Sequence, residues 1–353
     1  MALCKVKEGA IEFYSHIDSR VSKDLPVFYN PAMRLNRDLT ILILKGLDCR
    51  SLCDPLCGCG VRAIRFAREL GSVQITANDI SRQAVLLTRR NMRLNSVRFD
   101  VFGKDANILF MESKGFDYID LDVFGSPNFV LDSAIRRLSR NGVLAVTATD
   151  TAALCGTYPN ACRRKYWASP RRDEQMHETG LRILIRKVQL IGAQYERAMI
   201  PIFSYFKRHY FRIFFRAEKG KSRADAIIKN HGEFNGAGPM WLGELWDSDM
   251  VRHVKSLAGS TDKELADLIG LIAREAGVAS VGICDIHSLV KRNCLPRIPK
   301  REYVISAIEK KGYLASESHI CRTAIRTNCP EAKIIDLISG QHDSSSRPSR
   351  SPA

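Results

Sequence analysis

Short apolar segments alternate with helix-patterned segments over residues 50–216, and this alternation limits most strongly what the chain can fold into. Apolar runs of strand length occur at 51–54, 73–77, 97–102, 116–121 and 142–149, with two late strands expected at 198–203 and 211–215. Helical spacing is found at 61–70, 81–94, 127–138 and 182–195, and a helix over 37–47 precedes the first strand. Such alternation favours a parallel sheet covered on both faces. The sequence therefore predicts an α/β fold with a Rossmann-like, doubly wound, mostly parallel sheet, which binds ligands at the carboxyl ends of its strands.

The chain has 353 residues, more than one typical domain, and its pattern changes at about residue 219. Residues 232–239 hold three glycines and are predicted to form a loop, and helices are expected at 263–276 and 300–311. A smaller, mainly helical α+β domain should therefore follow the first one. The expected units are a first domain over 1–220, a C-terminal domain over 221–340, and a low-complexity, disordered tail over 341–353.

The net charge of +16 favours a polyanionic partner, because contacts to phosphates release counterions. A solvated basic surface without a partner is the alternative. The 11 cysteines are odd in number and irregular in spacing, which is typical of free thiols in a reducing compartment. No apolar run approaches the roughly 20 residues that a membrane span needs, and residues 1–13 lack the apolar stretch of a signal peptide. A cytoplasmic protein without a membrane anchor is predicted.

Three carboxylates follow three consecutive expected strands, and a glycine-rich turn accompanies the first of them. Asp54 precedes Gly58 and Gly60, where glycines let the backbone approach a ligand closely. Asp79 ends the second strand, at the position that binds two ribose hydroxyls, and Asp105 follows the third, where a carboxylate can accept a hydrogen bond from an adenine amino group. The sequence therefore predicts a nucleoside-cofactor site. A plain tight turn and a dinucleotide site stay open here, since the dinucleotide fingerprint tolerates alanine at its third glycine.

The fourth strand ends in Asp122, Val123 and Phe124, a sequence that suits methyl transfer to an exocyclic amine. The lone pair of an aryl amine is delocalised into its ring, so the amine is a poor nucleophile. A carboxylate and a backbone carbonyl that accept its two N–H bonds favour pyramidalisation and stabilise the developing positive charge. An aromatic side chain can hold the base by stacking. The alternatives are a helix cap or solvated strand end for Asp122 and a core position for Phe124.

Taken together, these motifs resemble those of the tRNA (guanine-26-N2)-dimethyltransferase family of the archaeal and eukaryotic type. The match is strong from residue 6 to residue 246 and weak beyond it. The matching runs are 28–31, 36–38, 60–65, 78–80, 122–127, 147–152, 177–178, 209–210 and 237–243. The resemblance implies a class I methyltransferase domain that uses S-adenosyl-L-methionine and transfers two methyl groups in succession to N2 of a guanine in tRNA.

The resemblance also implies residue roles by position. Asp122 would be the catalytic acceptor, and Phe28 and Phe124 would hold the guanine. The residues that would contact the cofactor are Arg37, Arg62, Asp79, Asp105 and Ala106.

Two departures from the family pattern are visible. Val123 replaces the family's proline, which keeps the carbonyl but removes a fixed backbone angle. Residues 217–239 contain no cysteine where many relatives carry two Cys-x-x-Cys pairs, so no structural zinc or other metal is expected. The spacing of Cys53, Cys57 and Cys59 does not fit a zinc knuckle, and buried free thiols are predicted there.

Two basic runs are candidate RNA surfaces. Residues 163–172 combine five cations with two aromatics close to the expected pocket rim, and residues 291–301 form a second run in the smaller domain. A solvated face is the alternative for each run. We expect a monomer that binds tRNA, with the small domain on the tRNA body and the target base flipped into the large one. The competing functions are methylation of ribosomal RNA guanine or DNA adenine, and a tRNA-binding chaperone without catalysis.

Overall fold

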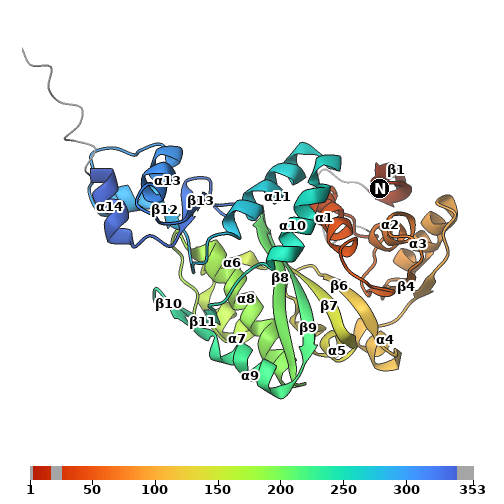
Figure 1. Ribbon diagram of the computed structural model, residues 1–353. Helices are drawn as coiled ribbons and strands as arrows, with labels where there is room; N and C mark the ends of the chain where they lie inside the picture. The colour runs from red at the N-terminus through yellow and green to blue at the C-terminus, as the bar shows by residue number, and fades with distance from the viewer. Residues whose placement is uncertain (1–2, 17–25, 340–353) are drawn as a thin grey trace, which may run out of the picture.

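The alternating segments form one seven-stranded sheet in the computed structural model, which describes residues 3–16 and 26–339. The strands are β3 (Ser51–Asp54), β4 (Gln74–Asn78), β5 (Asp100–Phe102), β6 (Phe116–Asp122), β7 (Leu138–Ala148), β8 (Arg197–Lys207) and β9 (Tyr210–Lys219). Their spatial order is β5-β4-β3-β6-β7-β9-β8 (Figure 1). The first five strands in this order pair parallel to one another. At one edge of the sheet, β9 pairs antiparallel with β7, and β8 pairs antiparallel with β9. The doubly wound, mostly parallel sheet is therefore confirmed, and its order reverses at β3, where such sheets open a crevice.

Helices cover the sheet in two groups. The first group is α1 (Arg34–Leu44), α2 (Val61–Glu69) and α3 (Arg82–Leu94), and the second is α4 (Ala106–Glu112), α5 (Leu131–Arg136), α8 (Met176–Ala193) and α9 (Lys221–Lys229). Within each group, helices that are neighbours in this order contact one another. Two short helices, α6 (Thr151–Leu154) and α7 (Pro159–Tyr166), follow β7 and pack against α8. An N-terminal hairpin of β1 (Leu3–Glu8) and β2 (Ile11–His16) packs on α2 and α3.

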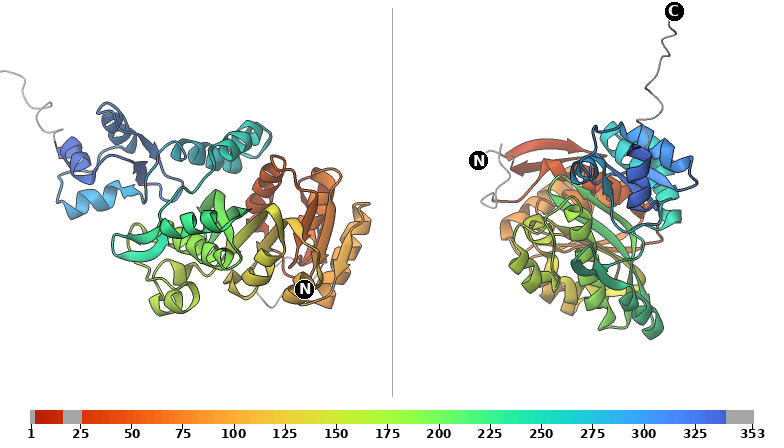
Figure 2. Two further views of the ribbon diagram at one scale, coloured as in Figure 1. Left: turned by 60° about the horizontal axis from the view of Figure 1, so that its bottom comes forward. Right: turned by 90° about the vertical axis from the view of Figure 1, so that its left-hand side faces the viewer.

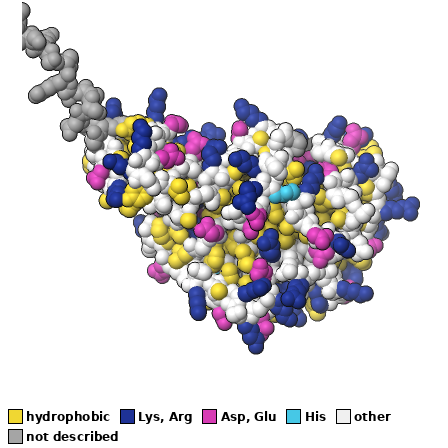
Figure 3. All heavy atoms as spheres, viewed as in Figure 1, with side chains coloured by type: hydrophobic (Ala, Val, Ile, Leu, Met, Phe, Trp, Pro, Cys, Tyr) yellow, Lys and Arg dark blue, Asp and Glu magenta, His cyan; other side chains and the backbone are white. Residues whose placement is uncertain are grey.

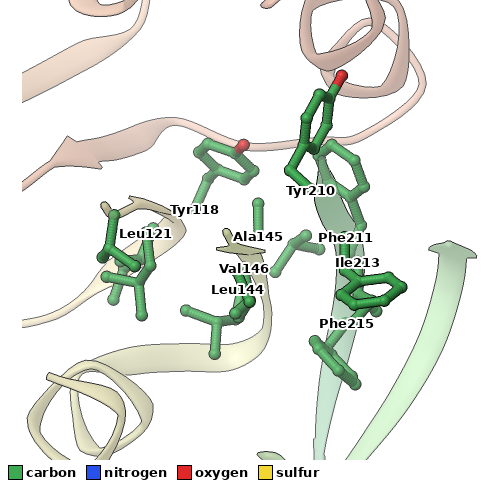
Figure 4. Packing of buried hydrophobic residues seen from close by; sticks show 14 of the residues in the cluster. Tyr118, Leu121, Leu144, Ala145, Val146, Tyr210, Phe211, Ile213 and Phe215 are labelled. Atoms are coloured by element: carbon green, nitrogen blue, oxygen red, sulfur yellow. The ribbon is translucent and has the colours of Figure 1, made fainter. Parts of the chain in front are cut away.

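The centre of the sheet is buried on both faces, as expected for strands between two helical layers. Side chains of β6, β7 and β9 pack side by side there (Figure 4). Tyr118, Leu144 and Phe211 are among its fully buried members. This continuous packing makes the sheet a rigid base for the loops at its carboxyl edge.

Element boundaries differ from the predicted ones in several places. The helix expected over 127–138 is a 3₁₀ turn, η2 (Pro127–Phe129), followed by α5, and β7 already begins at Leu138. The loop expected over 232–239 was wrong, because β10 (His231–Phe234) and β11 (Ala237–Trp241) form an antiparallel hairpin. Asn235 and Gly236 both have positive φ, 49° and 71°, as an Asn-Gly hairpin turn requires.

The part of the chain that follows β9 is mainly helical, as predicted. Helices α10 (Ser248–Leu257) and α11 (Lys263–Glu275), joined by the 3₁₀ turn η3 (Ala258–Ser260), pack on α1. The C-terminal unit then comprises β12 (Cys284–Asp285), α12 (Ile286–Arg292), α13 (Arg301–Glu309), β13 (Ala315–Glu317), β14 (Ala324–Thr327) and α14 (Glu331–Ser339). It holds a three-stranded sheet and its own hydrophobic core, and it lies at one end of the molecule (Figure 2).

Packing is continuous across the predicted boundary at residue 220, since α9 and β11 both lie on α8. That boundary stays a prediction, and the predicted disordered tail over 341–353 falls outside the described residues.

Lys and Arg side chains are spread over much of the face seen in Figure 3. No helix within the described residues has the length and apolar character needed to cross a bilayer.

Candidate active site

A cavity of about 840 Å³ opens at the carboxyl ends of β3, β4, β6 and β7. Its walls come from the loops that follow these strands, from residues 26–37, and from His209 in the turn between β8 and β9. Six of the eight predicted site residues line it, namely Phe28, Arg37, Arg62, Asp79, Asp122 and Phe124. The sheet order thus brings together side chains that are far apart in sequence.

The glycine-rich turn after β3 is tight enough to require its glycines. Gly58 and Gly60 have φ of 54° and 79°, in the left-handed region. A Cβ on Gly58 would lie 2.9 Å from the Phe28 carbonyl oxygen, and one on Gly60 would lie 2.6 Å from Cγ2 of Thr88. Gly60 also caps α2, so backbone N–H groups of the first helical turn face the cavity side of the sheet.

Two carboxylates stand beside this turn. Asp79 accepts hydrogen bonds from the backbone N–H groups of Gly58 and Ser81, each at 2.9 Å, which hold its side chain at the cavity wall. Asp54 is buried, and its Oδ2 atom has no hydrogen-bond partner among the described residues. Burial raises the pKa of Asp54 to about 7. An unsatisfied buried oxygen that lines a cavity fits a polar ligand group.

Asp105 and Ala106 do not line this cavity. They follow β5, one strand further out, where Asp105 caps α4 and accepts a hydrogen bond from the Asn107 N–H at 2.8 Å. Ala106 is buried in the helix. Their cofactor role stays a prediction, and the sheet does not bring them as close to Asp122 as the other predicted residues.

The end of β6 carries two carboxylates on one face, since residues two apart in a strand point the same way. Asp120 is fully buried and forms salt bridges with Arg212 at 2.7 Å and with Arg62 at 3.2 Å. Arg62 also pairs with Asp122, whose side chain is 23% exposed at the cavity. Asp122 is therefore the last residue of β6 and the partly exposed end of a buried ion network.

Arg62 and Arg37, both predicted to contact the cofactor, have protein partners at the cavity wall. Arg37 is buried and donates two hydrogen bonds to Glu8 from the N-terminal hairpin. Burial alone would raise the pKa of Glu8, but Arg37 and Arg65 hold it at about 2. These contacts anchor β1 and α1 beside the cavity.

Sequence reasoning missed Glu8, Asp120 and Arg212. For Asp120 a signal was present, because the two-residue period of the strand places it under Asp122. Glu8 and Arg212 become visible only when distant segments pack together.

The two predicted guanine-holding rings meet at the mouth of the cavity. Phe28 and Phe124 are in edge-to-face contact with centroids 5.9 Å apart, and 40% and 55% of their surfaces remain exposed. A core position for Phe124 is therefore wrong, and Val123 between Asp122 and Phe124 is the buried residue instead. Exposed rings at a polar cavity offer surfaces on which a flat base can stack.

The predicted free thiols are confirmed. Cys53, Cys57 and Cys59 are buried and unpaired with one another, and burial raises their pKa values. Over residues 3–16 and 26–339, no group of three potential ligands is placed to hold a metal ion.

The strand order and the polar cavity at the switch point are those of a Rossmann-like, class I methyltransferase. The chain belongs to the family described as N2,N2-dimethylguanosine tRNA methyltransferase, whose model matches residues 6–235 and 229–339.

Similar proteins cover nearly the whole chain. A tRNA (guanine(26)-N(2)/guanine(27)-N(2))-dimethyltransferase of Aquifex aeolicus is 36% identical over 92% of each chain. A tRNA (guanine(26)-N(2))-dimethyltransferase of Thermococcus kodakarensis is also 36% identical and covers 96% of this chain and 99% of its own length. The solved complex of Trm1 from Pyrococcus horikoshii with S-adenosyl-L-methionine has a TM-score of 0.88 at 34% identity, over 95% of this chain and 99% of that one. The resemblance drawn from the motifs is thus confirmed.

Proposed function

We propose that this protein transfers methyl groups from S-adenosyl-L-methionine to N2 of guanine 26 in tRNA, giving first N2-methylguanosine and then N2,N2-dimethylguanosine. The observation that carries the proposal is the position of Asp122 beside two exposed phenylalanine rings in a cavity at the switch point of the sheet. Family membership and the activities named for its relatives support the same reaction.

The residues around the glycine turn fit the cofactor. Gly58 and Gly60 leave room for close backbone approach, and the free Asp54 oxygen is available to a cationic or N–H group. We assign Asp79 to the ribose hydroxyls and place Arg37 and Arg62 at the wall of the same site. Asp105 and Ala106 would contact the adenine ring. When bound, the cofactor supplies an electrophilic methyl group on its sulfonium.

The chain's own contribution is to make the guanine amine nucleophilic and to orient it. Phe28 and Phe124 hold the flat base. The Asp122 carboxylate and the Val123 carbonyl accept the two N–H bonds, which directs the nitrogen lone pair out of the ring plane and stabilises the positive charge that develops. Arg62 keeps the Asp122 carboxylate in one orientation, anchored through Asp120. The amine loses its proton toward Asp122 after transfer.

We further propose that the protein acts as a cytoplasmic monomer and that the C-terminal unit, with its basic run at 291–301, contacts the tRNA body. The buried cysteines are free thiols, which fits a reducing compartment. The net charge of +16 supports a nucleic-acid substrate.

The experiment is methyl transfer from labelled cofactor to unmodified tRNA, ribosomal RNA and duplex DNA in parallel, with nucleoside mass spectrometry of the products. We expect label in tRNA as N2-methyl- and N2,N2-dimethylguanosine, and none in a tRNA transcript with adenine at position 26. Label only in ribosomal RNA or DNA would overturn the proposal. Binding of cofactor and tRNA without any transfer would favour the chaperone alternative.

A further inference from the structure

A basic and aromatic ridge at the end of α7 lies next to the loops that line the cavity. We call Arg163, Arg164, Lys165 and Trp167 the α7 ridge, and all four are exposed, Trp167 by 48%. Arg164 forms no salt bridge with any described residue. The buried Tyr166 lies between the exposed residues, so the ridge has an apolar anchor beneath it.

The ridge is bonded directly to the loop that carries the candidate catalytic residues. The Tyr166 hydroxyl donates to Asp150 at 2.6 Å and contacts Ser126 Oγ at 3.0 Å. Asn128 donates to the Lys165 carbonyl at 2.8 Å. Asp150 lines the cavity, and Ser126 follows Phe124 by two residues. The ridge is therefore held in place next to the mouth where the target base would enter.

Trp167 is presented in a conformation that its surroundings impose. Its φ of 57° and ψ of 40° lie in the left-handed region, which an aromatic residue rarely adopts. The Lys187 ammonium lies 3.0 Å from the ring centroid, and Arg186 donates to the Trp167 carbonyl at 3.2 Å. Two backbone hydrogen bonds between Ser169 and Gly238 fix the following residues.

One face of the indole is thus covered by a buried lysine, while half of the side chain remains accessible. A rigid aromatic ring with one covered face, set among cations beside a base-binding cavity, has the chemistry of a stacking platform for single-stranded nucleic acid.

We propose that Trp167 stacks on a nucleobase next to the flipped guanine, while the cations of the α7 ridge contact the phosphates that flank it. This inference rests on the proposed function. It adds that the substrate strand leaves the cavity along the α7 ridge. Stacking on the neighbour would keep the target nucleotide extruded and would compensate for the stacking that the guanine loses.

Tryptophan fluorescence tests the proposal directly, because the chain has three tryptophans and the other two, Trp241 and Trp246, are only 6% and 7% exposed. Titration with unmodified tRNA should quench the emission of the wild type. In Trp167→Phe the quench should disappear, while the Kd for tRNA changes less than about threefold because phenylalanine also stacks.

Trp167→Gly removes the ring, and glycine adopts the left-handed conformation without steric cost, so the backbone after α7 should keep its course. We expect kcat/KM for tRNA to fall by roughly 10- to 100-fold, with the KM for S-adenosyl-L-methionine unchanged. Arg164→Ala should weaken binding and reduce the salt slope of the affinity by about one ion. Arg98→Ala serves as the control, since this exposed arginine precedes β5 at the opposite edge of the sheet.

An unchanged quench in Trp167→Phe would overturn the proposal, as would a Trp167→Gly enzyme within twofold of the wild type. Failure of the proposed function looks different, because the wild type itself would then methylate no tRNA. Loss of stability in Trp167→Gly together with normal kcat/KM would show that the ring only packs, which also overturns the proposal.

Discussion

The molecule contains two buried networks of arginine and carboxylate side chains, and they differ in whether a carboxylate at the end of the network is exposed. Beneath the cavity, Arg212, Asp120 and Arg62 lead to Asp122, which is 23% exposed. Between α8 and the C-terminal unit, Glu178 pairs with Arg182 and Arg326, and Glu275 with Arg326 and His319, all at most 2% exposed.

The closed network ties distant segments together. Glu178 also accepts a hydrogen bond from the Gly282 N–H, and its salt bridge to Arg326 joins residues 148 positions apart. The open network ends in a carboxylate that a ligand can reach. The same residue types therefore attach segments in one place and leave a carboxylate accessible to a ligand in the other, depending on whether the last carboxylate is sealed or faces a cavity.

The largest expected effect is the loss of activity when Asp122, the exposed carboxylate of the open network, is replaced. Asp122→Ala should lower kcat for tRNA methylation by roughly 100- to 10,000-fold, because it removes the carboxylate that we propose accepts an amine N–H bond beside Phe124. Cofactor binding should be retained, measured by calorimetry alongside methyl transfer. Asp100→Ala, at an exposed carboxylate at the start of β5, is the matched control. Normal activity in Asp122→Ala would show that the exposed carboxylate of the open network has no part in catalysis.

Removing a carboxylate from the closed network should lower the stability of the fold instead of the activity. Glu178→Ala leaves Arg182 and Arg326 buried without their main partner, and we expect a loss of about 3 to 5 kcal/mol in the free energy of unfolding. Urea unfolding measures it. Glu302→Ala, which removes an exposed partner of Arg301, should cost less than about 1 kcal/mol. Equal effects of the two changes would contradict the assigned role of Glu178.

Acid should weaken the closed network in a defined pH range. Burial alone would raise the pKa of Glu178, but Arg326 and Arg182 hold it at about 2, below its value in the unfolded chain. Its contribution is therefore complete above about pH 4.5 and is lost as pH falls toward 2, on the order of 3 kcal/mol.

Unfolding free energies measured from pH 6 to pH 3 should fall less steeply in Glu178→Gln than in the wild type. Some acid sensitivity must persist in the variant, because Glu8 also has a lowered pKa. Identical slopes for both proteins would mean that Glu178 is not held ionised by its arginines.

A smaller effect is expected from changing the buried anchor of the open network. Asp120→Asn keeps the shape but no longer balances Arg62 and Arg212, so Asp122 should lose its fixed orientation. We expect kcat to fall about tenfold with the KM values for tRNA and cofactor nearly unchanged. Asp117→Asn is the control, at the other end of β6. A rise in KM without loss of kcat would show that Asp120 shapes the binding site instead of positioning Asp122.

The smallest effect should come from Val123→Pro, which introduces the residue that the family shows. The β6–β7 pairing ends at Asp122 and Thr147, so position 123 lies just beyond the last paired residue, where proline is tolerated better than inside a strand. Turnover should change by less than about threefold in a tRNA methylation assay. A gain of tenfold or more would mean that valine leaves the Asp122 turn too loose.

Much of the fold follows from local pattern. The strand and helix alternation, the glycine turn and the residues at positions 122–124 are legible because their period and spacing are properties of neighbouring residues. The hairpin at β10–β11 was also legible from Asn235 and Gly236, and the prediction of a loop overlooked that signal.

The sequence by itself determined the sheet, the family and which residues could reach the strand ends. Only the tertiary structure decided that Asp105 lies outside the main cavity and that Arg62 joins Asp120 to Asp122. It alone also decided that the exposed Trp167 lies beside the loop that carries the candidate catalytic residues. The physical reason is that these outcomes depend on long-range packing. Burial pairs each arginine with whichever carboxylate the folded chain brings near it, and no local period encodes that choice.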